Sequence, residues 1–427
     1  MKILKSSNKN FINSLNKILS KRGENLHNNI DKAVKNILKE VKDYGDEALI
    51  KYSKKFDKID LKIEDLLLQK KVRNSYKKNI NQKIFNSFLK TIHNVKKFHN
   101  LQKPKDYELS SNGVKIKSRW NPIDSVGLYI PGGKHVYPSS FIMNVVPAVI
   151  AGVKRIVCVT PPSKIINPYI LALFDQFKIQ EVYQIGGPQA IAALAFGTET
   201  IKPVNKIFGP GNHYVTSAKK QVFGKVGIDL IAGPSEIVVV ANESNNPSWV
   251  ATDLIAQAEH DINAQSILIT NSDKFAQKVI EQINIFKKKL PKENTISKSL
   301  KNNGIVIFVK NILESIDIIN NIAPEHLHLH VKEKVRILKN ISNAGCVFMG
   351  EYSTEAFGDY IVGSNHILPT FGSSKYSSGL GVLDFMKRNS IVQITSKGYK
   401  KNQNDVQQMA AVEGLYAHKL SVKIRQN

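Results

Sequence analysis

Histidine side chains are the first candidates for chemistry in this sequence, which contains 11 of them. His326, His328 and His330 alternate with leucines directly after Glu325. Residues two apart on a strand share a face, so the three imidazoles could surround a metal ion. The alternative reading is stronger, because side chains of one strand seldom converge on a single ion. On this alternative reading, His328 and His330 face solvent and bind no metal ion.

A second set of candidates combines histidine with amide and carboxylate side chains. Gln257 and His260 stand three apart on a predicted helix and therefore share one face. His260 is either a metal ligand or a residue that caps the helix end, and the spacing does not decide. Further candidates towards the C-terminus are Asp359, His366, Glu413 and His418. Glu413 and His418 are five residues apart, so one helical face does not strictly present both.

Four turns rich in glycine and proline, at 131–133, 186–188, 209–212 and 233–236, could hold a phosphate-bearing ligand. Open α/β sheets bind ligands at the carboxyl ends of their strands, where we expect these turns. Three of them lead into predicted helices, whose first N–H groups attract anions such as a pyrophosphate. None is a G-x-G-x-x-G, because Tyr214 replaces the third glycine after Gly209 and Gly211. One such turn alone would be an ordinary tight turn, but four close together favour a nucleotide site.

The elements that must position these residues follow a regular alternation from residue 125 onward. Short apolar runs predict strands at 126–130, 155–160, 182–185, 206–208, 237–240, 266–270 and 304–309. Helical stretches are predicted at 141–151, 168–177, 189–196, 213–222, 249–261 and 273–290. This rhythm predicts parallel α/β units with right-handed crossovers, in two blocks from about 125 to 235 and 237 to 350. The N-terminal region reads as helical, and a last helix is predicted at 404–419.

The charged residues describe a basic protein, with 61 Lys+Arg against 35 Asp+Glu and a formal net charge of +26. Only 7 of the basic residues are arginine, the side chain that clamps phosphates bidentately and reads bases. The lysines are spread over predicted surface helices such as 273–290 and are not gathered with aromatic residues in one stripe. We therefore expect a solvated basic surface and no nucleic-acid partner.

Length and hydropathy are typical of a globular protein with several domains. The longest nearly apolar stretch, 141–153, contains Asn144 and Pro147 and is shorter than the roughly 18 residues of a spanning helix. No unbroken apolar block follows the first lysines, which argues against a secretory signal. Two cysteines, Cys158 and Cys346, allow one disulfide at most. We expect a cytoplasmic protein that does not associate with membranes.

An ordered set of longer segments carries more specific information. The first is Ile-Asp-Leu-Ile-Ala-Gly-Pro-Ser-Glu-Ile at 228–237, which continues through a predicted helix to Gln257-Ala-Glu-His260. The others are 127–133, 187–191, 207–212, 323–326, 358–360 with 365–366, and 413–418. In residues, order and spacing, and over nearly the whole chain, this set resembles the histidinol dehydrogenase family.

The resemblance implies a zinc-dependent and NAD-dependent oxidoreductase that makes the last two steps of histidine biosynthesis. L-histidinol is oxidised through L-histidinal to L-histidine while two NAD molecules are reduced. The positions that match the zinc ligands are Gln257, His260, Asp359 and His418. Those that match substrate contacts are Ser235, His326, His366 and Glu413, together with the zinc ligands, and those that match NAD contacts are Tyr129, Gln189 and Asn212. Manganese or cobalt could occupy the same ligands as zinc.

The same resemblance assigns the two catalytic groups. His326 would take the hydroxyl proton during hydride removal, since histidine has a suitable pKa. Glu325 would activate water for the second oxidation, which needs a hydrated aldehyde. Neighbours on a strand point to opposite faces, so we predict a backbone turn at 324–326. Neither cysteine falls in a matched motif, which disfavours a thiohemiacetal route.

The family's architecture implies an intertwined homodimer of two incomplete Rossmann-like domains with small helical terminal domains. Mapped onto this chain, an N-terminal helical arm (1–26) precedes a discontinuous zinc and substrate domain (27–128 and 237–380). An NAD-binding domain (129–236) is inserted in it. A tail (381–427) would cross to the partner, so that Glu413 and His418 complete the partner's active site.

Two rival functions remain open at the level of sequence. A relative on the same fold could oxidise another amino alcohol, since motifs do not prove a pocket. A non-catalytic protein could use the basic surface to bind nucleic acid, although the intact set of polar residues and the shortage of arginine oppose it.

Overall fold

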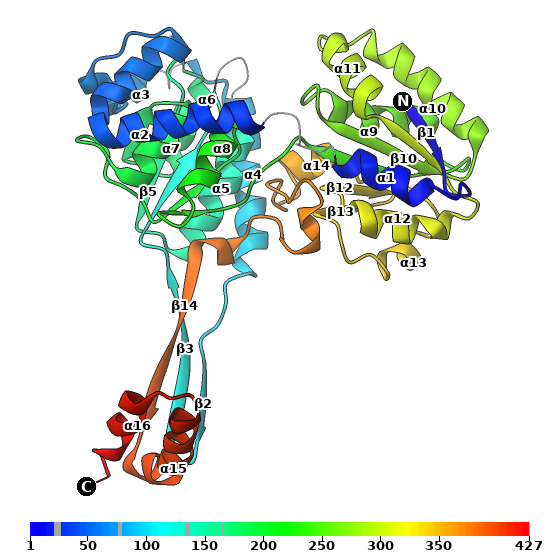
Figure 1. Ribbon diagram of the computed structural model, residues 1–427. Helices are drawn as coiled ribbons and strands as arrows, with labels where there is room; N and C mark the ends of the chain where they lie inside the picture. The colour runs from blue at the N-terminus through cyan, green and yellow to red at the C-terminus, as the bar shows by residue number, and fades with distance from the viewer. Residues whose placement is uncertain (21–26, 76–78, 133–136, 164–165, 427) are drawn as a thin grey trace.

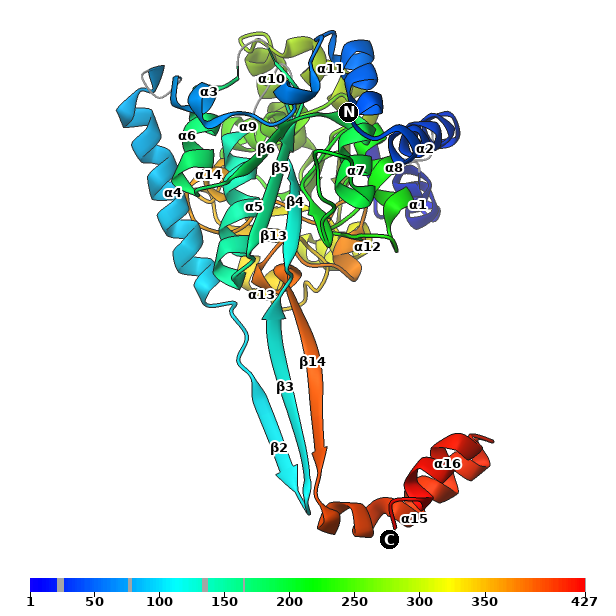
Figure 2. The same cartoon turned by 90° about the vertical axis from the view of Figure 1, so that its left-hand side faces the viewer.

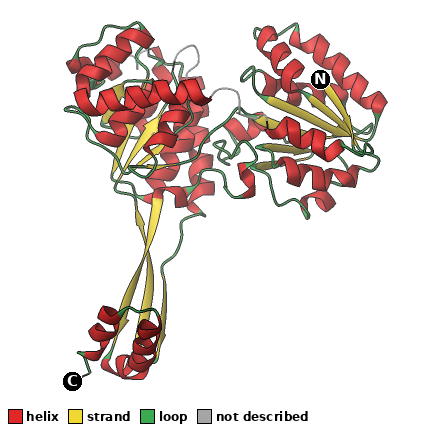
Figure 3. Cartoon of the chain, in the orientation of Figure 1, coloured by secondary structure: helices red, strands yellow, loops and turns green. Residues whose placement is uncertain are grey.

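The structure is a computed structural model that describes residues 1–20, 27–75, 79–132, 137–163 and 166–426. It contains two α/β units and a slender extension that carries the C-terminal helices (Figure 1). Strands form the centre of each unit and helices lie outside them (Figure 3). The predicted α/β class with parallel sheets is confirmed. Gly133 of the first glycine turn and Leu26, the predicted end of the arm, lie outside the described residues.

One unit is built on a parallel six-stranded sheet in the order β1-β11-β10-β9-β12-β13. The strands are β1 (Lys2–Lys5), β9 (Glu236–Val240), β10 (Gln265–Thr270), β11 (Ile305–Phe308), β12 (His326–Leu329) and β13 (Cys346–Met349). One face is covered by α9 (Pro247–Ala258), α10 (Asp273–Lys287) and α11 (Glu293–Asn303). The other is covered by α1 (Phe11–Ser20), α12 (Ser315–Ile322) and α13 (Lys334–Leu338). Burial on both faces explains why strands such as β9 read as continuous apolar runs.

The other unit is built on a parallel five-stranded sheet in the order β6-β5-β4-β7-β8. Its strands are β4 (Ser125–Tyr129), β5 (Arg155–Thr160), β6 (Glu181–Gln184), β7 (Lys206–Phe208) and β8 (Gly227–Ile228). The helices α2 (His27–Tyr52), α7 (Gly187–Phe196) and α8 (His213–Val222) pack on one face. On the other lie α4 (Gln82–Asn100), α5 (Pro138–Ala151) and α6 (Pro168–Gln176), with the short α3 (Lys70–Ser75) against α6.

A third, antiparallel sheet joins segments that are far apart in the sequence. It consists of β14 (Met386–Ile394), β3 (Val114–Pro122) and β2 (Tyr107–Ser111), with β3 in the centre. The sheet projects from the body of the molecule and carries α15 (Ser396–Val412) and α16 (Tyr416–Lys423) at its far end (Figure 2).

The sheets group the chain differently from the predicted division in two places. The division assigns 27–128 to the unit of residues 237–380, but α2 packs against α7 and α8 of the five-stranded unit. The cause is the apolar face of α2, which buries Val34, Val41 and Leu49 in that core. The N-terminal segment is also not a purely helical arm, because β1 pairs with β11. The other boundaries stay predictions.

The single helix predicted at 404–419 is wrong, because the chain forms two helices there. Gly414 adopts a φ of +70°, a left-handed conformation that ends a helix and that glycine adopts without strain. The N–H of Leu415 donates to the carbonyl oxygen of Ala410 at 2.8 Å and closes the end of α15. Glu413 therefore ends α15, whereas His418 lies on α16.

A buried ion pair fixes the glycine turn that follows β7. Lys219 of α8 pairs with Asp229 after β8, and both side chains are almost completely buried. Lys219 also donates to the carbonyl oxygen of Gly209 at 3.0 Å, and Asp229 accepts from the Gly209 N–H at 2.8 Å. Because each charge is buried with the other as its partner, neither can be removed without leaving the remaining charge uncompensated.

We therefore predict that Lys219→Met lowers the free energy of unfolding by about 3 to 5 kcal/mol, since it strands the Asp229 carboxylate. Urea denaturation followed by circular dichroism measures the change. Lys220→Met, at the exposed neighbouring position, is the matched control and should change stability little. Equal stability of the two variants would contradict the role of the pair.

Candidate functional site

A cavity of about 840 Å³ lies where the two α/β units meet. On one side it is lined by the turns after β4, β6 and β7 of the five-stranded sheet. On the other side lie the residues at the amino ends of β9 and β12. The fourth glycine turn, 233–236, thus leads into β9 and contributes to the site from the opposite unit. Among the predicted site residues, those that line the cavity are Tyr129, Gln189, Asn212, Ser235, His260, Glu325, His326, Asp359 and His366.

The glycine turns approach each other closely around Tyr129. The Gly187 N–H donates to the Tyr129 hydroxyl oxygen at 3.2 Å. Gly209 has a φ of +109°, and a Cβ at that position would lie 2.1 Å from the carbonyl oxygen of Tyr129. Only glycine fits there. Burial raises the pKa of Tyr129 to about 12, so the phenol stays protonated.

Two polar side chains of this wall differ in what they can offer a ligand. Gln189 is buried at the wall of the cavity, and its Oε1 has no hydrogen-bond partner within the described part of the chain. A buried acceptor without a partner fits a ligand that supplies a donor. Asn212 caps α8, because its side-chain oxygen accepts from the N–H groups of Tyr214 and Val215.

His326 is held as a neutral imidazole with one free nitrogen. Its Nδ1 lies 3.2 Å from the carbonyl oxygen of Glu236, an acceptor, so Nδ1 carries the proton. Nε2 is then a lone-pair acceptor, and it is buried without a hydrogen-bond partner among the residues that the structure describes. Burial is the main cause that lowers the pKa of His326 to about 3. Nε2 is therefore unprotonated at neutral pH, and its lone pair can accept a hydrogen bond from a ligand.

Glu325 lies beside His326 because the chain bends immediately before β12. Ala323 adopts a left-handed φ of +51°, and a bend follows at Glu325. Both side chains therefore line the cavity, which agrees with the predicted turn. Glu325 Oε2 accepts from the Glu236 N–H at 2.9 Å and lies 3.8 Å from His326 Nδ1. Burial raises the pKa of Glu325 well above its usual value.

His260 and Asp359 meet a third residue that the sequence analysis missed, Glu355. One ligand atom from each of the three lies within 4.8 Å of the others. Glu355 and Asp359 belong to α14 (Glu355–Tyr360) and are four apart, so they share a helical face. That spacing was visible in the sequence and could have drawn attention to Glu355. Burial raises the pKa of Glu355 well above its usual value, and the nearby Asp359 adds to the effect.

Gln257 is fully buried behind this group and does not line the cavity. One atom of its amide group lies 3.0 Å from Glu355 Oε2 and 3.2 Å from His326 Nδ1. Glu355 also lies 3.9 Å from His326 Nδ1 and 4.0 Å from His260 Nε2. It therefore links the residues that match metal ligands to the imidazole that matches the base.

His366 is held by two neighbours at the edge of the cavity. Its Nδ1 lies 3.1 Å from the carbonyl oxygen of Asp359, and its Nε2 lies 3.2 Å from Ser140 Oγ. The side chains of Glu413 and His418, in contrast, are exposed on the far extension (Figure 1). Within one chain the structure does not bring them to the cavity.

His328 and His330 do not face solvent, and that expectation is wrong. Both are buried, and each lies against the carboxylate of Asp253 on α9. The cause is that α9 covers the face of the sheet to which the alternate residues of β12 point.

Comparison with known proteins decides the family. The family model for histidinol dehydrogenase matches residues 20–426. The chain belongs to the histidinol dehydrogenase family. It is 43% identical to the histidinol dehydrogenase of Aquifex aeolicus over 96% of this chain and 95% of that protein. For the protein of that name from Gluconobacter oxydans, the identity is 42% over 100% of this chain and 99% of the relative.

A solved structure agrees with the sequence relatives. The crystal structure of histidinol dehydrogenase from Elizabethkingia anophelis superimposes with a TM-score of 0.93 at 35% identity, covering 100% of this chain and 98% of that one. Membership in the histidinol dehydrogenase family confirms the predicted oxidoreductase of histidine biosynthesis, for which NAD and a metal are the cofactors. No helix in the described ranges is both long and apolar enough to cross a membrane.

The state of His326 gives a prediction about stability. Unfolded histidine binds a proton below a pKa of about 6.5, whereas folded His326 does so only near pH 3. Between these values the unfolded state binds more protons, so the free energy of unfolding rises with pH. His326→Asn should therefore reduce this slope by up to about 1.4 kcal/mol per pH unit.

The slope of the free energy of unfolding against pH is measured by urea unfolding between pH 4 and 7, with protein from which a chelator has removed metal ions. His93→Asn, at an exposed position, is the control and should leave the slope unchanged. An unchanged slope for His326→Asn would show that His326 is not held neutral.

Proposed function

We propose that this protein oxidises L-histidinol through L-histidinal to L-histidine and reduces two NAD molecules in doing so. The observation that carries the proposal is the pairing of His326 and Glu325 at the wall of one cavity. One is a neutral imidazole with a free Nε2, and the other is a carboxyl group with a raised pKa. An alcohol oxidation needs the first, and hydration of an aldehyde needs the second.

The glycine-lined wall of the cavity supports the binding of NAD by Tyr129, Gln189 and Asn212. The Oε1 of Gln189, which no described residue contacts by a hydrogen bond, can accept one from a ligand. The helices α7 and α8 begin at this wall, so their first N–H groups favour a pyrophosphate there. When bound, the nicotinamide supplies the acceptor for a hydride.

The opposite wall supports a zinc site made by Gln257, His260, Asp359 and His418 of the partner subunit. Two imidazoles, an amide oxygen and a carboxylate form a donor set that suits zinc. His260 and Asp359 already lie together, and the His260 side chain is 40% exposed, which leaves it open to a ligand. Glu355 holds the Gln257 amide in place. Zinc would orient the substrate by binding its nitrogen atoms.

The proton steps follow from the two catalytic groups. In the first oxidation His326 Nε2 takes the proton of the substrate hydroxyl group, while the carbon that bears this group loses a hydride to NAD. In the second, Glu325 in its ionised form takes a proton from the water that attacks the aldehyde, and the hydrate then loses the second hydride. The raised pKa of Glu325 makes it a better base than an exposed carboxylate. Ser235, Glu413, His418 and His366 would contact and position the substrate.

A thiol does not compete for this role. Cys158 is buried in the core of the five-stranded unit, and neither cysteine lines the cavity. A covalent thiohemiacetal intermediate is therefore disfavoured, as the sequence predicts.

A homodimer accounts for the extension that carries Glu413 and His418. Apolar side chains on it are widely exposed, including Val392, Met409, Val412, Tyr416 and Ile424. Clusters of exposed apolar groups mark surfaces that another protein covers. If the extension packs on a second copy, Glu413 and His418 can reach that copy's cavity, which lacks them.

The catalytic assignment is tested by the yield of NADH per histidinol consumed. We expect two equivalents, with histidine as the product. Glu325→Gln should retain the first oxidation and yield about one equivalent, because water is no longer activated. Glu281→Gln, at an exposed site on α10, is the matched control and should still give two. A wild-type yield of one with released aldehyde would contradict the mechanism.

The shared site is tested by mixing two inactive variants, Asp359→Asn and His418→Gln. After unfolding and refolding together, mixed dimers should contain one intact site, and the mixture should recover about a quarter of wild-type activity. Each variant refolded alone is the control. A mixture that stays inactive while forming dimers would contradict exchange of the extension.

A further inference from the structure

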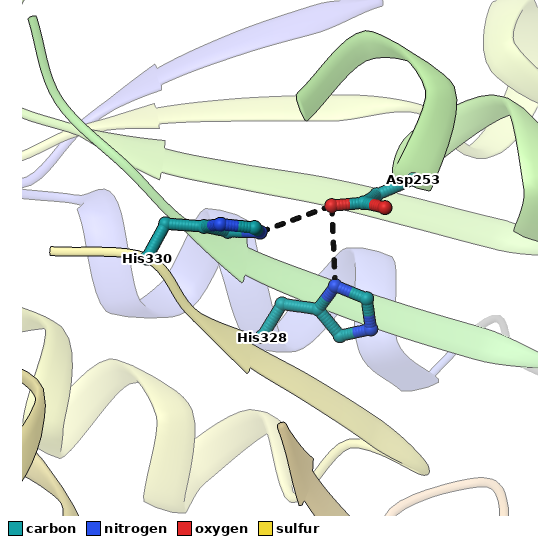
Figure 4. A group of neighbouring side chains, drawn as sticks. All are labelled: Asp253, His328 and His330. Carbon is teal, nitrogen blue, oxygen red and sulfur yellow. Dashed lines mark hydrogen bonds and ion pairs between the residues drawn. The ribbon is translucent and has the colours of Figure 1, made fainter. Parts of the chain in front are cut away.

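A second group of ligand-type side chains lies outside the cavity, deep in the six-stranded unit. Asp253, His328 and His330 are 6%, 0% and 5% exposed. Asp253 Oδ2 lies 3.3 Å from His328 Nδ1 and 3.0 Å from His330 Nε2. Figure 4 shows both imidazole rings directed at this one oxygen. No proposed step of the oxidation uses these residues.

Rigid elements hold all three side chains in place. His328 lies on β12 between β9 and β13, and His330 directly follows the strand on the same face. His330 is fixed by its own backbone, since its N–H donates to the Val240 carbonyl oxygen at 3.0 Å. Asp253 comes from α9, which covers this face. The third ligand therefore comes from a different element, which removes the objection that one strand cannot surround an ion.

The spacing of the three atoms fits a metal ion. Zinc binds nitrogen and oxygen ligands at about 2.0 to 2.2 Å, so neighbouring ligands of a tetrahedron lie about 3.3 to 3.5 Å apart. The two measured distances from Asp253 Oδ2 fall at or slightly below this range. All three ligand atoms lie within 4.8 Å of one another, so an ion could sit between them after small side-chain rotations.

The charge of the group also favours a cation. The carboxyl group of Asp253 is buried on the face of the sheet whose core is apolar. In the described part of the chain, the groups that pair with it are the imidazoles of His328 and His330. A divalent cation would neutralise the buried charge.

One residue of the group, His330, also borders a second cavity. His330 lines a separate cavity of about 560 Å³, with Asn245 and Glu351 at its wall. Asn245 Nδ2 donates to the His330 carbonyl oxygen at 3.1 Å and to Glu351 Oε1 at 3.0 Å, which fixes this wall. A water molecule from this cavity could complete a tetrahedral shell.

We propose that Asp253, His328 and His330 bind a second divalent transition-metal cation, of the zinc class, which ties β12 to α9. The site is structural, because the ion would lie among buried side chains and away from the cavity that holds His326. His328 is two residues from His326 on the same strand. The centroid of the Phe348 ring lies 4.8 Å from that of His328 and 6.1 Å from that of His326. The bound cation would therefore stiffen the strand whose first residue is the base.

Metal stoichiometry tests this proposal independently of the oxidation. The purified full-length protein is stripped with a chelator, dialysed against zinc alone, and analysed for zinc per chain by mass spectrometry. We expect two zinc ions in the wild type and one in Asp253→Asn, which keeps the size of the side chain. Asp359→Asn, in the catalytic group, should lose the other ion, and the double variant should bind none.

The same comparison separates failure of this site from failure of the catalytic one. If the wild type binds one zinc ion and Asp253→Asn binds none, the ion occupies the site of Asp253. That result would support the second site and contradict the catalytic zinc site. If the wild type binds one zinc ion and Asp253→Asn still binds it, the proposal is wrong. Two zinc ions bound to Asp253→Asn would also contradict it. Circular dichroism checks folding, and if Asp253→Asn does not fold, His330→Gln at the cavity wall replaces it with the same expected loss.

Discussion

The backbone of one residue, Glu236, holds both of the side chains that we propose as catalytic, Glu325 and His326. Its N–H donates to the Glu325 carboxylate and its carbonyl oxygen accepts from the His326 imidazole. These two bonds are possible because β9 and β12 are neighbours in register, with His326 opposite Ile237. They determine which nitrogen of His326 is free, and they keep Glu325 at the wall of the cavity. Both strands lie inside the six-stranded sheet, with β10 beside β9 and β13 beside β12.

Burial of this site has two opposite effects. Burial excludes water and keeps His326 neutral, but it also raises the pKa of Glu325 and Glu355 and packs several carboxyl groups close together. Such an accumulation of buried acids is unfavourable unless protons or a cation compensate it. A metal held by His260 and Asp359 would supply that compensation, so the chemistry proposed for the site and its electrostatics have the same requirement.

Much of the fold could be predicted from the sequence, because the period and length of its apolar runs distinguish strands from helices directly. The strands at 155–160 and 206–208 and the helix at 213–222 agree with the structure residue for residue. What failed depended on packing between distant segments. No local pattern shows that α2 covers the five-stranded sheet, or that α9 buries His328 and His330. The end of α15 at Gly414 was visible in principle, since glycine commonly ends helices. For the site, the motifs indicated candidate residues, but the contacts of Glu355 with Gln257 and His326 required the structure.

The proposed proton transfer depends most directly on the protonation state of His326, which the hydrogen bond to Glu236 determines. Nitrogen NMR of protein labelled in histidine, with the His326 signals assigned by comparison with His326→Asn, reads that state. We predict a neutral ring at pH 7, protonated on Nδ1 and bare on Nε2. A ring that carries its proton on Nε2, or that is doubly protonated at this pH, would contradict the assignment of His326 as the base.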